Sequence, residues 1–180
     1  MKDVWNPIID KYYGDNQPLK ELLLVHSRMV AEKAVSIACR HPELGADPEF
    51  VYQAGMLHDI GIFMTNATPI HCYGPHQYIC HGYLGADLLR REGLDACALV
   101  AERHTGTGLT LKQILECDLP VPHREMVPVS IEEQLVCFAD KFFSKTRPEE
   151  EKTVQQAVKS LEKFGPEGIE KFCLWCNTFL

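Results

Sequence analysis

The 180-residue sequence contains no apolar run near the ~18 residues that a membrane-spanning helix needs. Its start, MKDVWNPIID, does not resemble a signal peptide, because Asp3 and Pro7 interrupt the apolar region and no small-residue cleavage site follows. These absences predict a cytoplasmic protein with no membrane partner. In that compartment we expect all eight cysteines to be reduced.

A basic run is also missing. The sequence has 18 Lys and Arg against 25 Asp and Glu, which gives a net charge of −7. This balance disfavours nonspecific binding to DNA or RNA, so no nucleic-acid polymer is expected as a partner. A small-molecule phosphate substrate stays compatible with the charge, because a bound metal ion can supply local positive charge.

Strand signals are almost absent, since no segment alternates with period two and the apolar residues recur at helical spacing. With 46% hydrophobic and 24% charged residues, the sequence predicts one all-α globular domain over residues 1–180. Ser130 and Glu133 have the spacing of a capping box at a helix start. Irregular segments are expected at 62–80 and 118–128. Helices are expected at about 3–13, 18–39, 48–61, 81–92, 95–104, 110–116, 130–145, 149–163 and 166–178.

Several of these helices carry an imidazole or a carboxylate among apolar residues. The side chains are His26, His58, Asp59, His81, His104 and Asp140. Taken singly, a buried histidine with one hydrogen-bonded partner, or an aspartate held by an arginine, is the simpler interpretation. A buried carboxylate without a partner is costly, however, and one shared cation would satisfy all of these groups at once. The coincidence favours a metal site.

Imidazole and carboxylate ligands suit one or two ions of Fe, Mn, Co, Ni or Zn rather than Ca or Mg. A transition metal lowers the pKa of bound water from 15.7 to about 7 and so supplies hydroxide at neutral pH. Two ions roughly 3.5–4 Å apart also neutralise a phosphoryl group. Asp59 can bridge two ions because a carboxylate has two oxygens.

The ordered set His26, His58-Asp59 and Asp140 resembles the H…HD…D signature of the HD superfamily of metal-dependent phosphohydrolases. The stretch HDIG at 58–61 is the form that names one subgroup. The resemblance covers about residues 20–147 and implies an HD-type helical bundle with a helix before it and a helical extension after it. It also implies that the four residues bind one metal.

Two further histidines extend the resemblance. His81 in ICHGYLGADLL and His104 in AERHTGTG resemble the additional ligands of di-metal members, among them the bacterial diadenosine-tetraphosphate hydrolases of HD type. The resemblance implies that Asp59 would bridge two ions. The cyclic-di-GMP phosphodiesterases are a poor match, because Arg103 precedes His104 where they have a tandem histidine, and no Gly-Tyr-Pro segment follows.

Basic and hydroxyl side chains near these residues are candidates for binding substrate. Lys141 follows Asp140, so its ammonium could stabilise charge on a phosphate during catalysis; an exposed surface lysine is the alternative. Thr105 beside His104 could line a substrate pocket. Lys145, one helical turn beyond Lys141, and Arg28 near His26 are weaker candidates for binding a substrate phosphate.

The remaining polar motifs have simpler interpretations. His71 and His76, in the irregular 62–80 segment, could supply a general acid, but exposed loop histidines are favoured. Cys173 and Cys176 form a C-x-x-C, which lacks the two further ligands of a zinc site. Trp175 could pack the last helix on the domain or form a homodimer contact.

The resulting hypothesis is a phosphohydrolase in which metal-activated water cleaves a phosphate ester or anhydride of a nucleotide or related small molecule, with Asp59 and Lys141 as catalytic residues. Three alternatives stay open. The first is a di-iron oxygenase of HD type, the second a non-catalytic nucleotide-sensing module, and the third a helical scaffold without a ligand.

Overall fold

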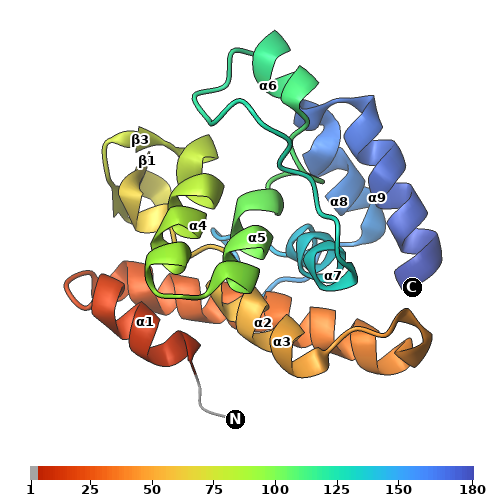
Figure 1. Cartoon of the computed structure of the whole chain (residues 1–180), viewed down its shortest axis with the longest axis horizontal. Helices are drawn as coiled ribbons and strands as arrows, with labels where there is room; N and C mark the ends of the chain where they lie inside the picture. The colour runs from red at the N-terminus through yellow and green to blue at the C-terminus, as the bar shows by residue number, and fades with distance from the viewer. Residues whose placement is uncertain (1–3) are drawn as a thin grey trace.

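The computed structural model describes residues 4–180, and within them α-helices dominate, as predicted (Figure 1). The start of the first predicted helix, at Asp3, lies outside the described residues. The α-helices are α1 (Trp5–Tyr13), α2 (Gln17–Arg40), α3 (Pro48–Leu57), α4 (His81–Arg91), α5 (Asp95–Arg103), α6 (Leu111–Glu116), α7 (Ile131–Asp140), α8 (Val154–Leu161) and α9 (Pro166–Phe179). Short 3-10 helices are η1 (Pro42–Leu44), η2 (Ile62–Met64), η3 (Thr68–Ile70), η4 (Tyr78–Cys80) and η5 (Glu162–Phe164).

Two helices end earlier than their apolar pattern predicts. The prediction that α3 continues to Gly61 is wrong, since α3 ends at Leu57. Nδ1 of His58 donates to the carbonyl of Gly55, to which the N–H of Asp59 would donate if the helix continued. The prediction that α7 continues to Lys145 is also wrong. After Asp140 the backbone changes to bonds between residues three apart, such as Phe143 N–H to the Asp140 carbonyl. Chain direction therefore changes directly beside two candidate ligands.

The segment 62–80, expected to be irregular, contains a small three-stranded sheet. Its strands are β1 (Thr65–Ala67), β2 (Cys72–Tyr73) and β3 (His76–Gln77), in the order β2-β1-β3. β1 pairs antiparallel with β2, Asn66 opposite Tyr73, and parallel with β3, Thr65 opposite His76. Strands of two or three residues are too short to show an alternating pattern, which explains why the sequence did not predict them.

Close helix packing brings the candidate ligands together. α2 packs along α3 and α7, and α4 packs on α5. A Cβ on Gly55 would lie 2.8 Å from Ala31 of α2, so the glycine permits the close approach of α3 to α2. At Gly61 a Cβ would clash with the carbonyl oxygen of His81, so this glycine lets the turn after Asp59 lie against the start of α4.

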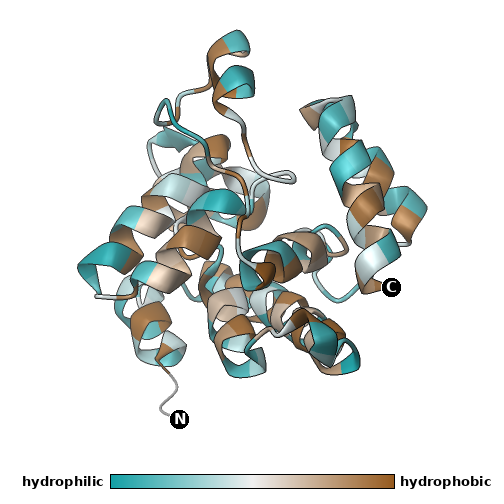
Figure 2. Cartoon of the chain, turned by 45° about the vertical axis from the view of Figure 1, so that its right-hand side comes forward, coloured by the Kyte–Doolittle hydropathy of each residue, from teal (hydrophilic) through white to brown (hydrophobic). Residues whose placement is uncertain are grey.

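The last helix, α9, packs on α7. Phe172, Trp175 and Phe179 of α9 surround Phe138 of α7, with ring centroids 5.1–6.5 Å away. Apolar and polar residues alternate around α8 and α9 in Figure 2, as expected for helices with one buried face. Trp175 thus packs α9 on the domain. Among the described helices none is both long and apolar enough to cross a membrane.

Candidate metal centre

The six candidate ligands meet in the interior, and five of them lie at helix ends. His26 is in the middle of α2. The others are His58 after α3, Asp59 next to it, His81 at the start of α4, His104 after α5, and Asp140 at the end of α7. All six are buried. Helix ends place these side chains at points where separate segments converge, rather than along the helix faces that the sequence pattern suggested.

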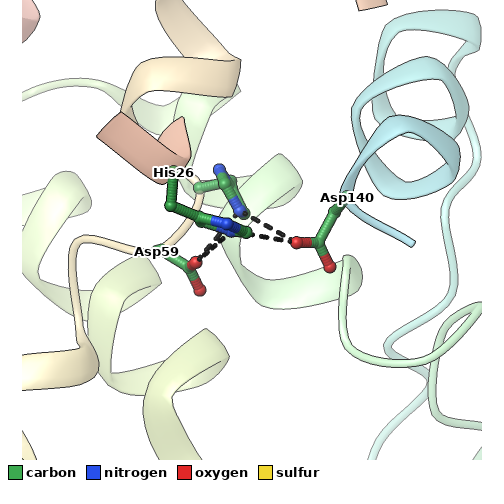
Figure 3. A group of neighbouring side chains, drawn as sticks. His26, Asp59 and Asp140 are labelled. Atoms are coloured by element: carbon green, nitrogen blue, oxygen red, sulfur yellow. Dashed lines mark hydrogen bonds and ion pairs between the residues drawn. The ribbon is translucent and has the colours of Figure 1, made fainter. Parts of the chain in front are cut away.

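The first group consists of His26, His58, Asp59 and Asp140. Nε2 of His26 lies 3.1 Å from Oδ2 of Asp59 and 3.1 Å from Oδ1 of Asp140. Nε2 of His58 lies 3.1 Å and 3.5 Å from the same two oxygens. In Figure 3 both carboxylates point toward the His26 ring, and Asp140 reaches it from α7. The four ligand atoms are close enough to share one metal ion.

The second group consists of Asp59, His81 and His104. Nε2 of each histidine lies 3.4 Å from Oδ1 of Asp59. Asp59 therefore directs Oδ2 toward the first group and Oδ1 toward the second. These three residues could hold a second ion, with Asp59 between the two.

Backbone carbonyls orient three of the four imidazoles. Nδ1 of His58 donates to the carbonyl of Gly55 at 2.6 Å, and Nδ1 of His81 to that of Tyr78 at 2.6 Å. Nδ1 of His104 donates to the carbonyl of Ala101 at 2.7 Å. With the proton on Nδ1, the Nε2 of a neutral ring offers a lone pair to the cluster. This is the arrangement that metal-binding histidines adopt.

Two observations show that a cation fits this site. Nε2 of His81 lies 3.0 Å from Nε2 of His104, so two lone pairs face each other. Burial and the nearby His104 lower the pKa of His81 to about 3, which disfavours a proton between the rings. Furthermore, Oδ1 of Asp59 is buried without a hydrogen bond of acceptable geometry, although Nε2 of His81 and Nε2 of His104 each lie 3.4 Å from it. A shared metal ion would satisfy these atoms.

The charge of the first group favours a cation as well. Burial lowers the pKa of His58, but the neighbouring Asp59 and Asp140 raise it to about 9. Burial opposes ionisation of both aspartates, yet the surrounding positive charges hold their pKa values well below the ordinary range. The two carboxylates are therefore ionised and keep a positive charge beside them, as a proton or as a metal ion.

Two lysines complete the charge balance. Nζ of Lys141 lies 2.7 Å from Oδ2 of Asp140 and donates to the His104 carbonyl at 3.1 Å. Nζ of Lys145 lies 2.6 Å from Oδ2 of Asp59. Burial lowers the pKa of Lys145, but Asp59 and other nearby groups raise it well above its ordinary value. Lys145 reaches Asp59 because α7 ends at Asp140. The prediction that Lys145 lies one helical turn beyond Lys141 assumed a helix that continued to Lys145.

A cavity of about 880 Å³ adjoins the site. His81, His104, Asp140 and both lysines line its inner end, together with Thr105, which is buried. Tyr78, which the sequence analysis did not single out, also lines it and stacks on His81 with ring centroids 4.7 Å apart. In the sequence, Tyr78 stands out only as an aromatic residue three positions before His81.

Other predicted residues lie elsewhere. Arg28 is exposed on α2 and does not line the cavity, because its position on the helix turns it away from His26. His71 and His76 are exposed, as the simpler interpretation expected. Cys173 is exposed, Cys176 is partly exposed, and all eight cysteines are free thiols.

Comparison with known proteins agrees with this geometry, since the family model described as HD domain matches residues 23–144, which include all six candidate ligands. The chain belongs to the HD domain family. An uncharacterized protein of Methanocaldococcus jannaschii is 33% identical to this HD domain protein over 146 residues, or 79% of this chain and 77% of the relative.

Two longer relatives carry the name tRNA (cytidine(56)-2'-O)-methyltransferase. The one from Thermoplasma volcanium is 34% identical over 161 residues, 89% of this chain and 42% of that protein. The one from Picrophilus torridus is 32% identical over 128 residues, 71% of this chain and 33% of that protein. The HD domain protein thus spans less than half of each. No solved structure matches the chain significantly.

Proposed function

We propose that this protein is a metal-dependent phosphohydrolase that cleaves a phosphate ester or anhydride of a nucleotide or related small molecule. The observation that carries the proposal is the position of Asp59, with one oxygen in each of two adjoining ligand groups. Family membership supports it, because HD domains include metal-dependent hydrolases. In this function His26, His58, Asp59 and Asp140 would hold one divalent transition-metal ion, and Asp59, His81 and His104 a second.

When bound, such ions lower the pKa of a coordinated water to about 7 and neutralise charge on a phosphoryl group. The chain's own residues supply the rest. The carbonyls of Gly55, Tyr78 and Ala101 keep three imidazoles in the tautomer that ligates. Lys141 and Lys145 line the cavity beside the ligands, and their ammonium groups would stabilise the negative charge that develops on the phosphate.

The far part of the cavity suits an organic group. Ile79, Leu109, Leu119 and Phe164 line it, together with Gln113 and the charged residues Lys112, Glu116, Glu162, Lys163 and Glu167. Apolar surface combined with polar groups that fix the orientation of a ligand is typical of small-molecule sites. A nucleotide would thus place its phosphate at the ligands and its base in this far part.

The test is a screen of phosphate compounds with protein loaded with Mn²⁺ or, anaerobically, Fe²⁺. The panel contains mononucleotides, nucleoside diphosphates, dinucleoside polyphosphates and tRNA with a terminal phosphate. We expect phosphate release from at least one small molecule. Lys141→Ala is expected to lower kcat while retaining the bound metal, and exposed Lys159→Ala serves as the control. No release from any compound by fully metal-loaded protein would contradict the proposal.

A di-iron oxygenase is the alternative within the same site, because its ligands also suit iron. Oxygen consumption during turnover with Fe²⁺ would identify it. The methyltransferase name belongs to two relatives of which this chain spans less than half. We propose that methyl transfer takes place in the part of those relatives that this chain does not match. The site in the matched part provides metal ligands instead. Methylation of tRNA by the present chain would contradict this assignment.

A further inference from the structure

Lys152 lies on the wall of the same cavity, apart from the ligand groups. Its backbone N–H donates to the carbonyl of Phe142 at 2.8 Å, and its Nζ lies 3.4 Å from the carbonyl oxygen of Lys141. These contacts fix the segment before α8 against the residues after α7. The side chain is partly buried and lines the cavity together with Lys141 and Lys145.

Lys152 has no paired carboxylate among residues 4–180, although Glu116, Glu162 and Glu167 also line the cavity. The other two inner lysines each pair with a carboxylate, Lys141 with Asp140 and Lys145 with Asp59. Burial lowers its pKa, as do Lys141, Lys145 and the rim residue Lys163, whereas Asp140 raises it. A cation held among other cations at a cavity wall is an anion-binding position.

We infer that Lys152 forms a second anion subsite, which selects substrates carrying another anionic group beyond the phosphate bound at the ligands. This inference rests on the proposed function for the identity of the first subsite. Lys141 and Lys145 lie at the inner end of the cavity, where the proposed function places the first phosphate. Lys152 is free to bind a second phosphate, and the expected ligand class is a compound with two phosphates, such as a nucleoside diphosphate.

The experiment compares AMP and ADP as binding probes. Metal-loaded protein is desalted, its metal content is measured, and each nucleotide is titrated by calorimetry. We expect the native protein to bind ADP about tenfold more tightly than AMP, the factor that roughly one added charge-assisted hydrogen bond supplies. Lys152→Gln should remove this preference and leave AMP binding unchanged. Lys152→Arg, which keeps the charge, should retain it.

The matched control is Lys159→Gln, because Lys159 is an exposed lysine of α8 that does not line the cavity. It should keep the preference for ADP. The inference is overturned if the native protein binds ADP no better than AMP, or if the preference survives in Lys152→Gln. The nucleotides are supplied as hydrolysis-resistant phosphonate analogues, so binding is measured without turnover and failure of the phosphate-release screen would leave this test intact. Conversely, loss of the ADP preference would leave the hydrolase proposal standing.

Discussion

The buried pair between Asp59 and Lys145 allows a quantitative test of the charge balance in the site. Nζ of Lys145 lies 2.6 Å from Oδ2 of Asp59, and the side chains are 15% and 0% exposed. Asp59→Asn removes the carboxylate and leaves a buried ammonium without its nearest partner. Breaking a buried pair in this way costs about 3–5 kcal/mol. At roughly 2–4 °C per kcal/mol for a chain of this size, the melting temperature should fall by about 10 °C.

The assay is thermal unfolding in the presence of a chelator, so that metal binding does not contribute. The double variant Asp59→Asn/Lys145→Met removes both charges and should recover a large part of the loss. As a control, Asp10→Asn removes the carboxylate of the pair between Lys20 and Asp10, whose Asp10 is 52% exposed, and should change stability little. If Asp59→Asn and the double variant have the same melting temperature, the inferred charge pairing of Asp59 with Lys145 is wrong.

The remaining predictions concern the second group, the turn after Asp59 and pH. His104→Ala should lower the metal content from about two ions per chain to about one, because the first group keeps all four ligands. His41→Ala, at a partly exposed turn away from the site, should change nothing, and an unchanged content in His104→Ala would exclude the second ion. Gly61→Ala should destabilise the protein and weaken metal binding, because its Cβ would clash with the His81 carbonyl; a variant that melts and binds metal normally would contradict this packing. With metal removed by a chelator, the free energy of unfolding should fall as pH rises from 6.5 through 9. The pKa of His58 is raised from 6.5 to about 9 in the folded protein, so the stability that its proton contributes is lost over this range. Urea unfolding at several pH values checks the sign, and stability that rises over this range would refute it.

The meeting of the six candidate ligands was predictable from the sequence, because this prediction did not require accurate helix ends. An imidazole or carboxylate within an apolar segment needs a partner wherever the helix stops. The same reasoning could not rank Lys145, whose position depends on the change from α-helical to shorter backbone bonds at Asp140. Apolar periodicity does not report that change, because Phe142 and Phe143 continue the apolar pattern beyond the helix end.

The small sheet and Lys152 were missed for a related reason. Pairing between β1, β2 and β3 depends on contacts over segments of two or three residues, which leave no period in the sequence. Lys152 becomes informative only through its distance from Lys141 and the absence of a carboxylate partner among residues 4–180. Both are tertiary properties.

The most direct test of the metal centre is the metal content of the full chain, measured by mass spectrometry after reconstitution with Mn²⁺ or anaerobic Fe²⁺ and removal of free metal. The structure predicts about two ions per chain, and loss of both in Asp59→Ala, whose carboxylate serves both groups. A correctly folded native protein that retains no transition metal, or an Asp59→Ala variant that retains its full content, would contradict the assignment.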